Sequence, residues 1–273
     1  MIINILTYLF SFVCIQLFSS WITGFVWYVA TGMSPAEALN MAVNPSQGGI
    51  NAPLLIVQTV VYGVITMIVF IRFKWSVVSP RYLRSRQWSV YFWCFVAALG
   101  TIIPMLWLQE LMPALPDTNR SAFRAVINTE FGYTALCIFA PLVEELVFRG
   151  AVLRLLLRSS LRPVYGIIVS ALLFALVHIN PAQMPHALII GLLLGWMYWR
   201  TGSILPGVAF HWTNNTVVFI ICRLAPYMQD MSLLEIFKGS QRSVILALVF
   251  SMLIFIPALL QLNILMKKAD GRR

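Results

Sequence analysis

The sequence predicts an all-α membrane protein, a polytopic bundle of about eight transmembrane helices. Of its 273 residues, 60% are hydrophobic and only 10% are charged, whereas about a quarter of the residues in a soluble domain carry a charge. The chain contains eight apolar runs that are long enough to cross or nearly cross a bilayer, which takes about 20 helical residues. The basic residues lie in short segments between these runs, a pattern typical of membrane topology.

The apolar runs extend along the whole chain and leave no polar block long enough to fold alone in water. We therefore expect one membrane domain over residues 1–273, with N-terminal helices in 1–130, a core in 131–222, and a last helix with a basic tail in 223–273. The first run lacks the basic n-region and cleavage site of a signal peptide, so we expect it to remain as a helix. The runs cover residues 5–30, 53–72, 88–108, 131–153, 163–180, 186–199, 204–223 and 243–266.

The formal net charge of +10 is explained by topology. No arm rich in Lys and Arg with interleaved aromatic residues is present, so we expect no nucleic-acid partner. If the N-terminus is cytoplasmic and the chain crosses eight times, 13 of the 19 basic residues lie on the cytoplasmic side and 5 outside, as the positive-inside rule favours. We expect an integral multi-pass protein of the plasma (inner) membrane with both termini in the cytoplasm. The cytoplasmic set is Arg72, Lys74, Arg81, Arg84, Arg86, Arg154, Arg158, Arg162, Arg200, Lys267, Lys268, Arg272 and Arg273.

Two adjacent carboxylates, Glu144 and Glu145, lie within the fourth run. A carboxylate at membrane depth is costly and usually faces a partner or a wet cavity. Glu145 and Arg149 are four residues apart and share a helix face, so we expect them to pair. Glu144 points about 100° away around the helix and is freer to face a cavity. Two carboxylates in different environments commonly provide one base and one structural anchor.

The other polar residues of the apolar runs follow the same four-residue spacing. His211 and Asn215 can point at one substrate atom, and an imidazole and an amide are suitable donors to an oxyanion. Phe174 can form a wall of the site and orient His178, whereas His186 is predicted to be a structural residue of a short loop. At about 1.5 Å per residue, His178 lies far deeper than His211 from the start of its run, so we expect the fifth helix to be recessed or tilted.

Taken in order, Glu144-Glu145-x-x-x-Arg149, Phe174-x-x-x-His178 and His211-x-x-x-Asn215 resemble the three-motif signature of the CPBP intramembrane proteases. This family includes the type II CAAX prenyl proteases and the bacteriocin-processing and self-immunity proteins of the Abi group. The resemblance covers roughly residues 130–222, and the first helices carry no matching motif.

The resemblance implies a CAAX-protease-like endopeptidase with its catalytic core in 131–222, acting on a membrane-anchored peptide or protein within the lipid bilayer. Glu144 would activate water, His178 would hold or activate that water, and His211 and Asn215 would form the oxyanion hole. Glu145, Arg149 and Phe174 would support them.

Alternatives remain open for the cofactor and for the function. We expect no cofactor, and the competing mechanism is a zinc ion held by Glu144, His178 and His211, although the H-E-x-x-H motif of many zinc peptidases is absent. The competing functions are a non-catalytic immunity or scaffold protein of the same fold and a proton-coupled transporter that uses Glu144 as its proton site.

Overall fold

The computed structural model describes residues 1–77 and 88–267, and within these residues the chain is helical without a β-strand, as the all-α prediction requires. Six basic residues of the topology prediction (Arg81, Arg84, Arg86, Lys268, Arg272 and Arg273) lie outside the described residues. The α-helices are α1 (Ile2–Ala30), α2 (Pro35–Val43), α3 (Ala52–Arg72), α5 (Trp88–Glu110), α6 (Arg120–Ile127), α7 (Ala140–Glu144), α8 (Arg154–Leu157), α9 (Pro163–Leu176), α10 (Met184–Thr201), α11 (Leu205–Leu224), α12 (Leu233–Ile236) and α13 (Gln241–Leu265). Short 3₁₀ and π segments are η1 (Pro45–Gly48), η2 (Thr134–Phe139), η3 (Glu145–Leu153) and η4 (Pro226–Asp230).

Each predicted apolar run contains a helix, but the count of eight membrane crossings is not confirmed. By length and composition, four of the described helices can span a membrane, namely α1, α3, α5 and α13. The fifth run was predicted to be helical to residue 180, and this is wrong because α9 ends at Leu176 after 14 residues. At about 1.5 Å per residue, α9 is about 21 Å long, which is shorter than the hydrocarbon core.

The helix that carries the two glutamates is continuous from Thr134 to Leu157, but its hydrogen-bonding pattern changes along the way. The π segments η2 and η3 flank the short α7, and the residues at each junction keep right-handed helical backbone angles. Pro141 lies near the first junction and has no N–H to donate, so it disturbs the regular ladder there. Wide turns of this kind occur frequently at functional sites, and both glutamates lie at the junction of α7 and η3.

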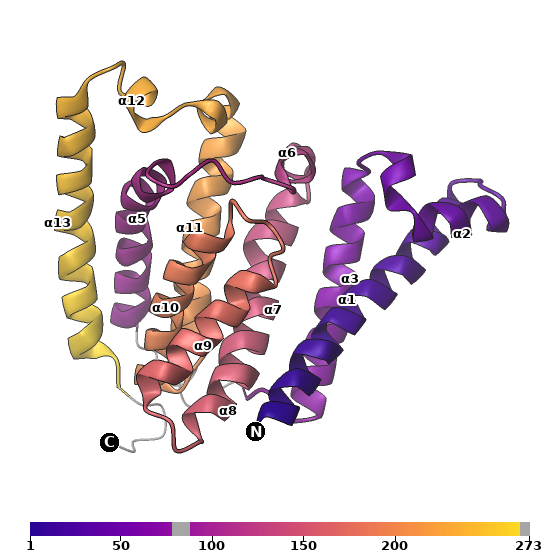
Figure 1. Ribbon diagram of the computed structural model, residues 1–273, viewed down its shortest axis with the longest axis horizontal. Helices are drawn as coiled ribbons and strands as arrows, with labels where there is room; N and C mark the ends of the chain where they lie inside the picture. Colours follow the sequence, from indigo (N-terminus) through magenta and orange to yellow (C-terminus); the bar gives the residue numbers. More distant parts are fainter. Residues whose placement is uncertain (78–87, 268–273) are drawn as a thin grey trace.

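The helices form one bundle in which α1 and α3 pack together on one side and α5 and α13 on the other (Figure 1). The continuous helix from Thr134 to Leu157, which contains α7 and is called the long helix below, lies between these two pairs together with α9, α10 and α11. The upper part of α1 leans away from the bundle and carries α2 with it (Figure 1). The core of the described part is apolar and centres on Phe148 and Phe174, with a second cluster between α5, α10 and α13.

Close helix approaches depend on glycine. A Cβ atom on Gly191 would lie 3.1 Å from the Cβ of Ala171, and one on Gly195 would lie 2.9 Å from the side chain of Ile167. The Gly191–Gly195 spacing therefore lets α10 pack directly on α9. On the other side, the Gly100 backbone of α5 packs against the Phe255 backbone of α13 in the same way.

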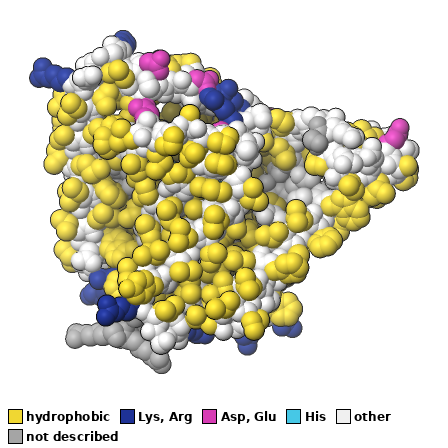
Figure 2. Space-filling view, viewed as in Figure 1, with side chains coloured by type: hydrophobic (Ala, Val, Ile, Leu, Met, Phe, Trp, Pro, Cys, Tyr) yellow, Lys and Arg dark blue, Asp and Glu magenta, His cyan; other side chains and the backbone are white. Residues whose placement is uncertain are grey.

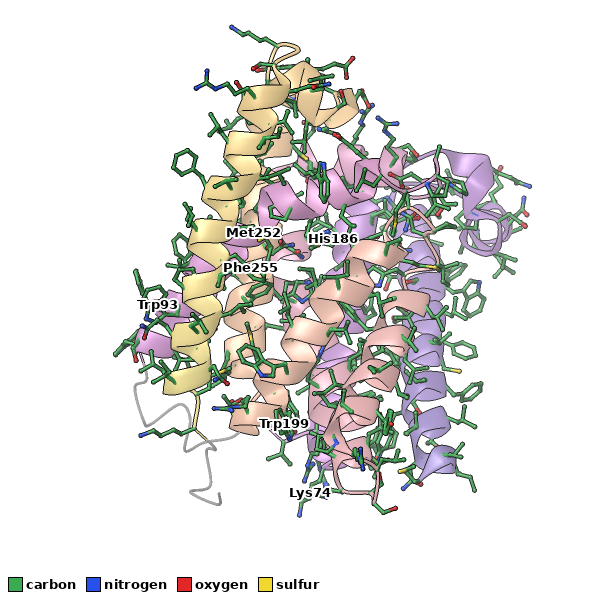
Figure 3. The ribbon with its side chains drawn as sticks, turned by 60° about the vertical axis from the view of Figure 1, so that its left-hand side comes forward. Lys74, Trp93, His186, Trp199, Met252 and Phe255 are labelled. Carbon is green, nitrogen blue, oxygen red and sulfur yellow. The ribbon has the colours of Figure 1, made fainter. Side chains whose placement is uncertain are left out.

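Met1 and the last residue of α13, Leu265, lie at the same end of the bundle (Figure 1). Arg200 lies at this end, where it donates to the carbonyl of Asn263, and Lys74 lies there too (Figure 3). On the face shown in Figure 2, hydrophobic side chains cover the middle of the bundle. Acidic side chains occur only at the opposite end, beside other basic ones. This distribution is that of a membrane protein with one basic end.

Candidate active site

Glu145 and Arg149 form the buried ion pair that their spacing predicts. Both side chains are fully buried, and Arg149 Nη1 donates to Glu145 Oε1 over 2.8 Å. Arg149 Nη2 donates to the carbonyl of Gly191 over 3.2 Å, and the guanidinium carbon lies 4.4 Å from the centre of the Phe174 ring. Arg149 therefore ties the long helix to both α9 and α10, and its charge is compensated by a carboxylate and an aromatic face.

His211 lies between the two carboxylates. Its Nδ1 is 3.3 Å from Glu145 Oε1, and its Nε2 is 3.7 Å from Glu144 Oε2. The imidazole is nearly buried, with 6% of the residue exposed. The contact with Glu145 was not predicted from the sequence, because the two residues lie 66 positions apart. Glu145 therefore holds both Arg149 and His211, and His211 directs its second nitrogen to Glu144.

Gly207 makes room for this arrangement. A Cβ atom at Gly207 would lie 2.7 Å from Glu145 Oε2. The residue precedes His211 by four positions on α11, so it shares the helix face of the imidazole. Sequence reasoning missed Gly207, although its spacing from His211 was the signal that could have found it.

Glu144 differs from its neighbour in exposure. A quarter of its side chain is exposed, whereas that of Glu145 is fully buried. Tyr62 of α3 interacts electrostatically with Glu144. The neighbouring Gly63 lets α3 approach the long helix, since a Cβ atom there would lie 3.2 Å from the side chain of Val143. The two carboxylates thus have the contrasting environments that the sequence predicts, and Tyr62 is a site neighbour that no sequence motif revealed.

His178 lies two residues beyond the end of α9, in the turn that leads to α10. Its Nδ1 lies 2.7 Å from the carbonyl oxygen of Phe174, and because a carbonyl can only accept, Nδ1 carries the proton. The Phe174 ring packs edge-on against the imidazoles of His178 and His211, with centroid distances of 4.8 and 6.0 Å. Phe174 therefore packs against both histidines.

His178 and His211 both pack against the Phe174 ring, although His178 lies just past the end of α9 and His211 lies near the start of α11. The sequence suggested a recessed or tilted fifth helix, and the structure adds that the α10–α11 turn is buried. Thr201, Ser203 and Ile204 of that turn are buried, whereas Leu161, just before α9, is exposed. His211 therefore reaches the Phe174 ring although it lies only six residues after Leu205.

Asn215 lies on the same face of α11 as His211, but its amide is already engaged. Asn215 Nδ2 donates to the carbonyl of Leu136 over 3.0 Å. In the π turn, Leu136 would accept from the residue five positions on, which is Pro141 and has no N–H. Asn215 thus satisfies a carbonyl that the helix cannot, and it retains one N–H for another acceptor.

His186 was predicted to be a structural residue of a loop, and its place is different. It lies in the first turn of α10 and within the bundle, well away from Lys74 at the basic end (Figure 3). It interacts electrostatically with His178 and His211. It also lines a small pocket with Met105, Leu108, Gln109, Met112, Ala182 and Pro185. All three histidines of the chain therefore lie around one region.

The zinc alternative requires Glu144, His178 and His211 to converge on one ion. Across residues 1–77 and 88–267, no group of three or more His, Cys, Asp or Glu side chains is placed to hold a metal. Nδ1 of His178 is turned to a carbonyl, and both nitrogens of His211 face carboxylates. The residues as placed do not fit a zinc centre.

Comparison with known proteins agrees with this site. A family model described as type II CAAX prenyl endopeptidase Rce1-like matches residues 127–217. No curated protein and no solved structure matches the chain. The matched segment contains all three sequence motifs, from Glu144 to Asn215. The predicted resemblance is therefore confirmed, and over residues 127–217 this chain is similar to the type II CAAX prenyl endopeptidases of the CPBP intramembrane protease family.

Proposed function

We propose that the protein is an intramembrane endopeptidase that hydrolyses a peptide bond of a membrane-anchored substrate with water activated by Glu144. The observation that carries the proposal is the placement of a partly exposed Glu144 beside His211, which the fully buried Glu145 holds. Water attack on an amide needs a base, stabilisation of the developing oxyanion, and an acid for the leaving amine. The site has a residue for each of these needs.

Glu144 is the base in this scheme. Its carboxylate takes a proton from the attacking water and then delivers that proton to the departing amine. His178 holds the same water, because its Nδ1–H is engaged by Phe174 and the neutral ring leaves Nε2 as an acceptor.

His211 and Asn215 stabilise the oxyanion. When Nε2 of His211 is protonated, it donates to the oxygen that gains charge, and Asn215 adds the N–H that Leu136 does not use. Glu145 and Arg149 do not touch the substrate. Their buried pair fixes the orientation of His211, and a site held this firmly loses little free energy in reorganising during the reaction.

The family match supports a choice of substrate class. The matched model describes endopeptidases that act on the CAAX prenyl motif, a C-terminal Cys-a-a-X sequence whose cysteine carries an isoprenoid. We propose a membrane-anchored peptide of this kind as the first substrate to test. We place the protein in the plasma membrane with both termini in the cytoplasm, because the N-terminus and the end of α13 lie at the basic end of the bundle (Figures 1 and 2).

The test uses purified full-length protein in liposomes and a quenched-fluorescence peptide that ends in a farnesylated Cys-a-a-X sequence. Cleavage by the natural sequence and its loss in Glu144→Gln support the proposal. In parallel, the termini of membrane proteins from cells that express either form are compared by mass spectrometry, so that other substrates are found. If neither experiment shows a product that depends on Glu144, the protease proposal is wrong. Flux driven by a pH gradient in the same liposomes would then favour a transporter.

A further inference from the structure

His178 is held by a turn that departs from regular helix geometry. After Leu176 the backbone amides of His178 and Ile179 donate three residues back, over 3.3 and 3.2 Å. In a longer helix the carbonyl of Phe174 would accept from the backbone N–H of His178. It accepts instead from the imidazole of that residue. The direction of the imidazole therefore depends on how this turn is fixed.

Ile179, the residue after His178, has a φ of +49°. This left-handed conformation is unfavourable for an L-residue, and most of all for a β-branched one. The side chain is 77% exposed, so packing of Ile179 does not hold the backbone in place. Residues held in such conformations persist only where the surroundings over-determine them.

The next residue, Asn180, provides those surroundings. It is 4% exposed, and its side-chain amide donates to Asp117 Oδ1 over 2.8 Å and accepts from the backbone N–H of Thr118 over 3.3 Å. Its carbonyl accepts from the N–H groups of Gln183 and Met184 at the start of α10. Asn180 thus joins the α9–α10 turn to the segment between α5 and α6.

Further bonds complete this junction, which we call the Asp117–Asn180 bridge. The hydroxyl of Thr118 donates to the carbonyl of Ile179 over 3.4 Å, and the N–H of Ala182 donates to the carbonyl of Pro116 over 3.3 Å. Asp117 Oδ1 also accepts from the N–H of Asn119. The bridge therefore contacts Ile179, Asn180 and Ala182, the residues that follow His178 in the turn.

We infer that Asp117 and Asn180 are positioning residues for His178. The bridge keeps Ile179 left-handed, and this backbone conformation turns the imidazole toward the Phe174 carbonyl so that Nε2 faces the site. The inference rests on the proposed function for the task of His178, which is to hold the attacking water. It adds two residues that lie outside the three motifs.

The first test needs no substrate. The chain has only three histidines, so the full-length protein labelled with ¹⁵N-histidine in nanodiscs gives three imidazole spectra, and His178→Gln identifies that of His178. We expect a fixed Nδ1–H tautomer for His178. In Asp117→Ala and in Asn180→Ala this signal should move toward that of a free imidazole, while the His211 signals stay in place. An unchanged His178 spectrum in both variants overturns the inference.

Asp230→Ala is the matched control, because Asp230 is another carboxylate near α6, and its partners are Arg120 and Arg124 rather than the α9–α10 turn. It should leave all three spectra unchanged. A shift of the His178 signals in this variant as large as in Asp117→Ala would mean a general response and would overturn the inference.

The second test measures cleavage of the farnesylated Cys-a-a-X peptide. Displacement of a catalytic group by about 1 Å can cost about 100-fold in rate, so Asp117→Ala should lower kcat by about 10- to 100-fold with KM within about twofold. In a His178→Ala background the same change should have no further effect. An equal loss in both backgrounds would show a structural role and overturn the inference. If the natural sequence cleaves nothing, the protease proposal fails, and the histidine spectra still decide whether the bridge positions His178.

Discussion

Nε2 of His211 lies 3.7 Å from Glu144 Oε2, while Nδ1 of the same ring lies 3.3 Å from Glu145 Oε1. One imidazole therefore lies between two consecutive carboxylates that differ in exposure and in partners. Only Glu144 is exposed enough to meet water, and only Glu145 is bound to Arg149. Substitutions of the two glutamates should consequently have different effects.

Glu144→Gln should abolish catalysis and leave stability unchanged. A positioned general base contributes about 10²- to 10⁴-fold to rate, and the amide cannot take a proton from water. The side chain is partly exposed, so the change leaves no buried charge unpaired. The initial rate on the farnesylated peptide and the thermal midpoint of the detergent-solubilised protein check this. A variant with more than about a tenth of the original rate would contradict the role of Glu144 as the base.

Glu145→Ala should instead destabilise the fold. It leaves the fully buried guanidinium of Arg149 without its carboxylate, and loss of one partner of a buried pair costs about 3–5 kcal/mol. Arg124→Ala is the matched control, because its pair with Asp230 is exposed and such pairs contribute about 0–1 kcal/mol. Thermal unfolding in one detergent should show a much lower midpoint for Glu145→Ala than for Arg124→Ala. Similar midpoints would contradict the structural role of the pair.

Gly207→Ala should damage the site through Glu145. The added methyl group would lie 2.7 Å from Glu145 Oε2, so the carboxylate or α11 must move. Overpacking of this kind costs about 1–3 kcal/mol, and the rate should fall because His211 loses its position. Gly24→Ala on α1 is the control, since its new Cβ would meet its nearest neighbour at an ordinary 3.6 Å. The measurement is the rate together with the thermal midpoint, and equal behaviour of the two variants would be evidence against this crowding.

Removal of metal should not change the rate. The described residues offer no set of three or more ligands to an ion. In the proposed mechanism Glu144 activates the water and His211 stabilises the oxyanion, which are the tasks a metal would otherwise perform. Dialysis against 1,10-phenanthroline, followed by elemental analysis and an assay in metal-free buffer, provides the check. Activity that disappears with bound zinc and returns when zinc is added would replace this scheme with the metal alternative.

The parts of this site that follow helical periodicity could be predicted from the sequence. Glu145 and Arg149 pair because they are one turn apart, and Phe174 reaches His178 for the same reason. The contact of Glu145 with His211 could not be predicted, since it depends on how two distant helices pack. His186 gave no signal for a comparable reason, because its importance lies in neighbours that the fold brings to it.

The depth of each residue within the bundle also could not be predicted from the sequence. Counting residues from a helix start assumes that all helices start at one level, and the buried α10–α11 turn around Ser203 violates this assumption. The early end of α9 was hidden because Val177 continues the apolar run past Leu176. Asp117 and Asn180 were overlooked because neither belongs to a motif, and only the folded chain shows that they hydrogen-bond to each other.

The strained turn beside His178 leads to a final prediction. If the Asp117–Asn180 bridge exists to hold Ile179 left-handed, then a residue that adopts this conformation freely should need the bridge less. Glycine has no Cβ and avoids a penalty of about 1–2 kcal/mol, so Ile179→Gly should restore part of the activity that Asn180→Ala removes. Because Ile179 is largely exposed, Ile179→Gly alone should cost little packing. Ile179→Val tests the specificity of the rescue, since it shortens the side chain but keeps the β-branch. Peptide cleavage by the two double variants gives the answer. Equal rates for the glycine and valine double variants would show that strain at Ile179 is not what the bridge opposes.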